Sequence, residues 1–177
     1  MNDPNWQQLL IGSHPRLFLR SYRGLSVAPG YPLCPSGWRE VVATMVNRVA
    51  CSANGYPVHF TQIAQRCGIL SISWCTTARL PTRLEHAIDE AIALAEARSA
   101  CTCATCGDPG RLHCTGGLLL PICPAHIRDV SVPAFTHADQ VYLVRELGRD
   151  DASIIRRRKY DRVRDVFTVV DPSTDIE

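Results

Sequence analysis

The sequence contains little lysine and few aromatic residues. Neither feature is typical of a chain that binds nucleic acid. Lys159 is the one lysine among 19 basic residues, and aromatic residues make up 7% of the chain. An arginine excess of this kind is what GC-rich coding produces, so it does not by itself predict phosphate binding. The formal net charge of +2 also predicts no nucleic-acid partner.

Long apolar runs are absent as well. The first 20 residues hold no stretch long enough for a signal-peptide core, and nowhere do about 18 apolar residues follow one another. We therefore expect a soluble, cytoplasmic protein without a membrane partner. In a reducing cytosol the odd count of nine cysteines argues against a disulfide framework and favours metal ligation.

The usual catalytic motifs are also missing. The sequence has no HExxH, nucleophile elbow, phosphate loop or dinucleotide fingerprint. The nearest match to a zinc-deaminase motif, "HAD" at His137, has aspartate for glutamate and follows the cysteines. We expect a protein that is not an enzyme; the alternative is a metal- or thiol-dependent enzyme, for instance one using Cys67 with His59.

What is present predicts an α+β fold with one core. The 177 residues are 46% hydrophobic, which is ordinary for a globular domain. We divide the chain into an extended, proline-rich arm, an α+β body of two helices and a β-hairpin, a zinc-binding module and a helical C-terminal region. The four parts cover residues 1–35, 36–100, 101–130 and 131–177.

Within the body, apolar residues at helical spacing predict a helix over 36–53 with Ser36 as its N-cap. Alternating patterns predict strands over 58–63 and 69–75. A second helix over 81–100 would be opened by a capping box from Thr82 to Glu85.

Residues 101–126 hold five of the nine cysteines and suggest a metal site. Cys103 and Cys106 form C-x-x-C, and Cys123 and His126 form C-x-x-H after sixteen residues, the paired spacing of a structural zinc site. Gly116-Gly117 between the pairs predicts a hairpin. A knuckle, a hairpin and a helix starting near Pro124 would make a treble-clef or zinc-ribbon module with one structural zinc. Cys101 or Cys114 could replace a cysteine ligand, and His113 could replace His126, but only by breaking a two-residue gap.

From Pro35 to His126 the chain resembles a group of small, uncharacterised bacterial and phage proteins. The motifs that carry the resemblance are Gly37-Trp38 at a helix start, "FTQIAQRCGILSISW", "AEARSA" at 95–100, "CATCGDPG" and "CPAH". The resemblance places the zinc residues at Cys103, Cys106, Cys123 and His126. It implies an origin in mobile elements and no particular reaction.

The last third of the chain is strongly basic at one point. Patterns over 136–148 and 150–167 predict two helices broken at Gly148, with Ile154, Ile155, Val163, Val166 and Phe167 on the buried side. Candidate phosphate-binding residues on the second helix are Arg156, Arg157, Arg158, Lys159, Arg162 and Arg164. The alternative is that these residues form a solvent-exposed face with no binding role, partly paired with Asp161 and Asp165.

From these features we expect a non-enzymatic, zinc-stabilised protein that docks on a host protein or nucleoprotein complex. Inhibition of a host defence system, such as a CRISPR effector, would suit the size and the predicted origin. A DNA-binding regulator is the alternative, and the helical C-terminal region could also pair two copies of the chain.

Overall fold

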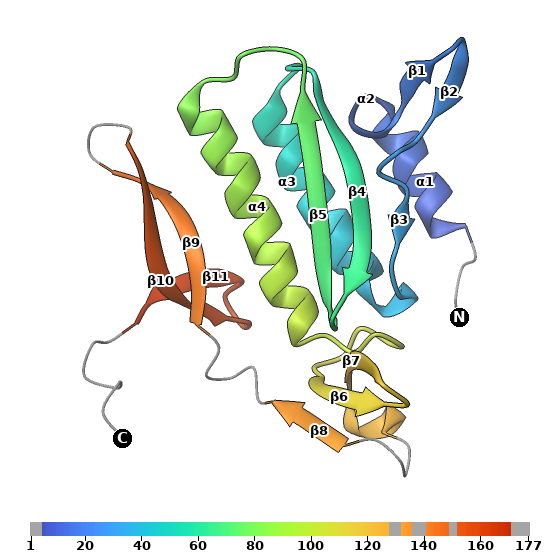
Figure 1. Ribbon diagram of the computed structural model, residues 1–177, viewed down its shortest axis with the longest axis vertical. Helices are drawn as coiled ribbons and strands as arrows, with labels where there is room; N and C mark the ends of the chain where they lie inside the picture. The colour runs from blue at the N-terminus through green and yellow to red at the C-terminus, as the bar shows by residue number, and fades with distance from the viewer. Residues whose placement is uncertain (1–4, 128–131, 136–140, 149–151, 171–177) are drawn as a thin grey trace.

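The computed structural model describes residues 5–127, 132–135, 141–148 and 152–170. The fold is α+β and is built around one long helix, α4 (Thr82–Ala100). Figure 1 shows α4 between a sheet-and-helix body on one side and a separate C-terminal sheet on the other, with the cysteine-rich module at its C-terminal end. No helix among the described residues is long and apolar enough to cross a membrane.

The body has the predicted order of helix, hairpin and helix. A 3-10 turn, η1 (Ser36–Trp38), leads into α3 (Arg39–Ala53), so Trp38 rather than Ser36 is the N-cap. Strands β4 (Val58–Arg66) and β5 (Ile69–Thr76) pair antiparallel, and α3 and α4 pack on one face of them (Figure 1). The body helices and the hairpin are confirmed. The capping box is not formed, because Pro81 is the N-cap of α4 and makes no side-chain cap hydrogen bond.

The core between these layers is aliphatic and aromatic. The largest fully buried side chains come from η1, α3, β4, β5 and α4, together with two from the N-terminal region: they are Trp38, Phe18, Phe60, Met45, Ile63, Leu70, Ile88, Val42, Val46, Val49, Val58 and Pro32. A core of this kind supplies the hydrophobic free energy that holds the two layers together.

The N-terminal residues form more regular structure than an extended arm. They contain α1 (Trp6–Ser13), α2 (Pro15–Phe18), β1 (Arg20–Tyr22), β2 (Leu25–Val27) and β3 (Pro32–Leu33). β1 and β2 make a small hairpin, and β3 joins the body sheet parallel to β4. Phe18 packs on Phe60 with ring centroids 5.3 Å apart, so this region contributes to the core. The backbone at Gly30 lies directly against Phe60. Only glycine fits there, because a Cβ on residue 30 would lie 2.4 Å from Phe60 Cβ.

The outer edge of β5 is sealed by side chains of α4. Ser99 Oγ accepts a hydrogen bond from the Leu70 amide at 2.8 Å, and Trp74 Nε1 donates to Asp89 Oδ1 at 3.3 Å. Between these two contacts, the Glu96 carboxylate accepts a hydrogen bond from the Ile72 amide. Burial raises the pKa of Glu96, and this hydrogen bond partly offsets the rise. An edge strand whose amides are satisfied this way is a poor template for pairing with another chain.

The cysteine-rich module follows α4. It consists of β6 (Arg111–Thr115), β7 (Leu118–Ile122), the 3-10 turn η2 (Pro124–His126) and β8 (Val132–Phe135), in the sheet order β7-β6-β8. The predicted hairpin is confirmed, and its turn uses positive φ at Gly116 and Gly117, +58° and +81°. Where we expected a helix, the described residues after Cys123 form only the turn η2. Residues 128–131 lie outside the description.

The C-terminal region is a sheet, and the prediction of two helices is wrong. Strands β9 (Val141–Leu147), β10 (Ser153–Asp161) and β11 (Val166–Val169) form an antiparallel sheet in the order β11-β10-β9. The predicted buried side fails as well, since Val163 is 96% exposed. The start of the first predicted helix at 136–140 and that of the second at 150–151 lie outside the described residues, as do residues 149 and 171–177.

Cross-strand partners explain why strands form here. Tyr142 and Tyr160 both pack on Phe167, with ring centroids 5.7 and 5.8 Å away. Across β9 and β10, Arg158 Nη2 donates to Glu146 Oε2 at 2.7 Å. Such cross-strand pairs stabilise a sheet even where the spacing of the apolar residues would also suit a helix. In addition, Val, Ile and Tyr favour strands.

Candidate metal centre

The first half of the site is a tight loop directly after α4. The Cys103 amide donates to the Asp108 carbonyl at 2.7 Å, and the Gly107 amide donates to the Cys103 carbonyl at 3.0 Å. Gly107 has a φ of +89°, which the turn requires and which glycine adopts without strain. This geometry is the predicted knuckle, and it directs Cys103 and Cys106 to one side.

The second half comes from the end of the β6–β7 hairpin. Cys123 follows β7, and η2 carries His126 back toward it, with the His126 amide donating to the Cys123 carbonyl at 2.9 Å. The two halves are joined by the Ala104 amide, which donates to the Pro121 carbonyl at 2.8 Å. The hairpin therefore fixes the second pair of ligands against the knuckle.

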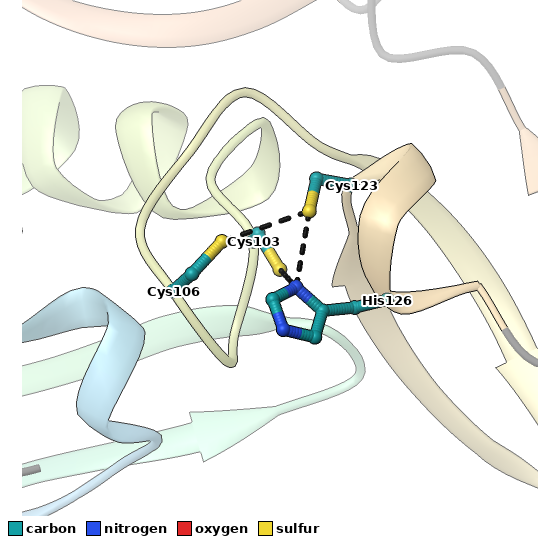
Figure 2. A group of neighbouring side chains, drawn as sticks. All are labelled: Cys103, Cys106, Cys123 and His126. Atoms are coloured by element: carbon teal, nitrogen blue, oxygen red, sulfur yellow. Dashed lines mark hydrogen bonds between the residues drawn. The ribbon is translucent and has the colours of Figure 1, made fainter. Parts of the chain in front are cut away.

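Figure 2 shows the four predicted side chains pointing toward one another. Their ligand atoms all lie within 4.8 Å of each other. Cys106 Sγ lies 3.6 Å from Cys123 Sγ, and His126 Nδ1 lies 3.2 Å from Cys123 Sγ and 3.8 Å from Cys103 Sγ. Metal–sulfur bonds of about 2.3 Å in a tetrahedron put two sulfurs about 3.8 Å apart, whereas a disulfide needs about 2.05 Å. Cys103, Cys106, Cys123 and His126 therefore form a group able to hold one metal ion.

The two knuckle thiols have different proton affinities. Burial alone would raise the pKa of Cys103, but backbone amides of Cys106, Cys123 and Thr105 donate to its sulfur and bring the pKa down to about 6. For Cys106 the Asp108 amide favours the thiolate, yet desolvation and the bonds its thiol makes to Asp108, Cys123 and Cys103 raise the pKa to about 12. Metal ligation requires thiolates, so binding of a cation by this group would release protons.

The knuckle is locked onto the start of α3 by Gly37 and Trp38. The Gly37 amide donates to the Ala104 carbonyl at 3.0 Å, and Trp38 Nε1 donates to the Thr102 carbonyl at 2.8 Å. A Cβ at Gly37 would lie 2.3 Å from the Cys103 carbonyl oxygen. From the sequence we took these two residues only as a helix start. The signal that could have placed them here is a Gly-Trp pair before a helix in a chain that also carries a knuckle.

The spare donors lie outside the group. The Cys101 thiol donates to the Arg98 carbonyl at 3.3 Å, and burial raises its pKa. His113 is buried in β6, and its Nδ1 has no hydrogen-bond partner among the described residues. Cys114 is half-buried on the same strand. The structure therefore brings together the predicted set rather than the alternatives.

The thiol–imidazole hypothesis for Cys67 with His59 is wrong. Cys67 sits in the β4–β5 turn, whereas His59 pairs with Cys75 at the opposite end of the hairpin. Seven residues of strand at about 3.3 Å each put more than about 20 Å between them. They cannot act on one substrate atom.

The candidate phosphate-binding residues lie on β10 and the β10–β11 turn, not on a helix. Four of them contact described partners. Arg156 Nε lies 3.6 Å from Glu146, and Arg158 also pairs with Glu146. Arg162 Nε donates to the Cys101 carbonyl at 3.2 Å, and Arg164 Nε lies 3.8 Å from Asp161. Arg157 and Lys159 lie on the same strand. These contacts give the arginines structural roles, and phosphate binding stays a prediction.

Comparison with protein-family models, with curated proteins and with solved structures finds no match for this chain. The family resemblance that the motifs carry thus stays a prediction.

Proposed function

We propose that this chain is a non-enzymatic interaction protein stabilised by one structural zinc ion bound to Cys103, Cys106, Cys123 and His126. The observation that carries the proposal is the closed set of four donors. Structural zinc sites take four protein ligands, while catalytic sites keep one position for water. Four donors whose ligand atoms all lie within 4.8 Å of one another favour the structural role.

The donor types favour zinc over harder cations. Three thiols and an imidazole suit a borderline-soft ion and disfavour magnesium or calcium, which take oxygen ligands. Zinc binding can contribute on the order of 10 kcal/mol to the folding of a small module. That free energy compensates for a short hairpin with few buried apolar side chains, Leu112 being one of them.

The interaction surface that we propose is the outer sheet face, which we define as Leu143, Arg145 and Ile155. Leu143 is 74% exposed and Ile155 is 66% exposed. Both line a hollow of about 380 Å³ where the C-terminal sheet meets Ile72, Trp74 and Ile92 of the body. Asp89, Glu96 and Arg145 line the hollow beside these apolar side chains. A hollow that combines exposed apolar side chains with charged groups is the kind of surface that can bury a partner's hydrophobic anchor.

For the partner we propose a protein or nucleoprotein complex of a host cell, because the motif resemblance implies an origin in mobile elements. Blocking a defence complex of the CRISPR type needs a rigid body and a docking surface but no catalytic group. Pairing of two copies through the same face is the competing occupant, and light scattering after size exclusion separates the two.

The test is affinity purification from host lysate with matched surface variants. Leu143→Asp should lose the retained partner, whereas Leu25→Asp, at a 69% exposed leucine of the β1–β2 hairpin, should retain it as the wild type does. Both variants should still bind one zinc by native mass spectrometry. Equal retention by both variants would remove the outer sheet face from the proposal.

A second candidate is DNA binding through the arginines of β10 and its turn. The observation in its favour is exposure, since the Arg164 side chain is 77% exposed and that of Arg156 is 54% exposed. Phosphate-driven binding weakens steeply with salt, in proportion to the phosphates neutralised. A flat response of binding to salt between about 50 and 200 mM would exclude this candidate.

A further inference from the structure

The β10–β11 turn lies across the outer side of the two long helices and inserts one carboxylate between them. Asp165 Oδ2 lies 2.6 Å from Arg48 Nη2 on α3, and Asp165 Oδ1 lies 3.9 Å from Arg98 Nη1 on α4. The Tyr160 hydroxyl donates to the same carboxylate. We call Arg48 and Arg98, with the carboxylate between them, the arginine clamp.

The clamp stands in the middle of a groove between α3 and α4. On one side of it lies a pocket of about 670 Å³ that reaches the knuckle, and on the other side lies a second of about 640 Å³. Both are lined by Thr44, Arg48, Leu94 and Asp165, so they meet at the clamp. The turn therefore divides one helix–helix groove into two parts.

Small residues keep this groove open. Ala87, Ala91 and Ala95 recur every fourth residue along α4 and line it together with Val41 and Met45 of α3. Side chains at this spacing share one helix face. A groove with an apolar floor and two guanidinium groups at its centre fits a segment that carries a carboxylate among apolar side chains.

The turn is held over the groove mainly by polar contacts. Among the described residues of β9, β10 and β11, Val144 alone is buried. Besides the clamp, Arg98 Nη1 donates to the Arg162 carbonyl at 2.5 Å, and Arg145 Nη1 lies 3.2 Å from Asp89 Oδ2. Partly exposed ion pairs contribute little to stability, so local release of the sheet costs much less than unfolding of the body.

We propose that the arginine clamp is a receptor for a carboxylate of an acidic partner segment, and that Asp165 occupies it in the free protein as an internal competitor. The partner segment displaces the turn and lies along the α3–α4 groove. This inference rests on the proposed function as an interaction protein, and it adds a second contact and a partner chemistry. Arg39, Glu40, Glu90 and Asp108 also line the groove, and Arg39 Nε lies 3.6 Å from Glu40 Oε1. Glu90 and Asp108 disfavour a nucleic acid, which carries a charge at every phosphate, more than a peptide with a single carboxylate placed at the clamp.

The test uses two synthetic peptides, acetyl-Leu-Ala-Glu-Ala-Leu amide and its counterpart with Gln in place of Glu. In Asp165→Asn the competitor is uncharged, so the Glu peptide should bind at least about ten-fold tighter than to the wild type. Amide shifts in a 15N NMR titration should map to α3 and α4 around Thr44 and Leu94. The Gln peptide should bind neither protein, and Asp165→Asn combined with Arg98→Gln should lose the gain.

Asp89→Asn is the matched control. It removes a further ion pair between the C-terminal sheet and the body, that of Arg145 with Asp89, but leaves the clamp occupied. Its peptide affinity should equal that of the wild type. A gain equal to that of Asp165→Asn would mean general loosening and would overturn the clamp.

A measurement on the wild type covers the case in which Asp165→Asn does not fold. With millimolar Glu peptide, hydrogen exchange at Val166–Val169 should speed up while that of α3 and β4 stays unchanged. No change in exchange, or no gain in the variant, overturns the inference. Such a failure would not affect the Leu143→Asp test of the proposed function. Conversely, if Leu143→Asp retained the partner while the Glu peptide still bound at the clamp, the outer sheet face alone would be overturned.

Discussion

Two joints connect the parts of this molecule to the body, and they rest on different kinds of interaction. The knuckle joins the body through Gly37 and Trp38, with neutral hydrogen bonds in a buried, close-packed contact. The C-terminal sheet joins the body through arginines whose side chains are about a third or more exposed, Arg48, Arg98 and Arg145. Each of those pairs contributes only about 0–1 kcal/mol.

The difference teaches which part can move. A close-packed contact whose buried polar groups are all hydrogen-bonded allows a single arrangement. Any shift would open a void or leave a buried polar atom without a hydrogen bond. Exposed ion pairs exchange readily with water and salt. We therefore expect the metal module and the body to open as one unit, and the C-terminal sheet to open alone.

The largest expected effect comes from removing a metal ligand. Cys103→Ser should lose the bound zinc and, with it, a contribution on the order of 10 kcal/mol to the folding of the module. Native mass spectrometry and hydrogen exchange over 101–127 measure both. Cys51→Ser, at an exposed cysteine of α3, is the control and should keep the zinc and the fold. A Cys103→Ser protein with full zinc would refute the ligand assignment.

A single methyl group at the knuckle joint should be the next most damaging change. Gly37→Ala places a Cβ 2.3 Å from the Cys103 carbonyl oxygen and 2.7 Å from that of Ala104. Overpacking of this kind costs about 1–3 kcal/mol, measured by denaturant unfolding. Gly12→Ala in α1 meets nothing within 4 Å and should be neutral or stabilising. Equal stability of the two variants would mean that the joint is not tight.

Removing one hydrogen bond from the same joint tests its polar part. Trp38→Phe leaves the Thr102 carbonyl without the indole donor, and an unsatisfied buried acceptor costs about 1–3 kcal/mol in addition to the lost ring area. Zinc affinity should fall with stability, because the knuckle loses its anchor. Unchanged zinc affinity in a competition titration would show that the knuckle is held by its own loop alone.

The smallest effect should come from salt acting on the other joint. Raising the ionic strength from about 0.05 to 1 M shortens the screening length to about 3 Å, which weakens the pairs of Asp165 and Asp89. Hydrogen exchange should then speed up in β10 and β11 and stay unchanged in α3, β4 and the knuckle. A uniform response of all elements would end the distinction between the two joints.

Local pattern was enough for the body and for the site. The helices α3 and α4, the β4–β5 hairpin and the Gly116-Gly117 turn follow from spacing and turn chemistry within about 20 residues, and these are what the structure has. The four donors could be predicted for the same reason, because two short gaps fix each pair locally and a tetrahedron joins the pairs.

Prediction failed where the deciding contacts lie far apart in the chain. Val141–Leu147 and Ser153–Asp161 carry apolar residues at spacings that suit a helix, but pairing of Tyr142 and Tyr160 with Phe167 and of Arg158 with Glu146 makes them strands. The roles of Gly37 and Trp38 were hidden too, since their partners are about 65 residues away.

The sequence by itself determined the elements of the body and the identity of the four candidate metal donors, because both depend on neighbours along the chain. Only the tertiary structure decided that Gly37 closes on the Cys103 carbonyl and that Asp165 fills a clamp made by two helices. Such contacts depend on how segments that are far apart in the sequence pack together, and composition or spacing carries no record of that packing.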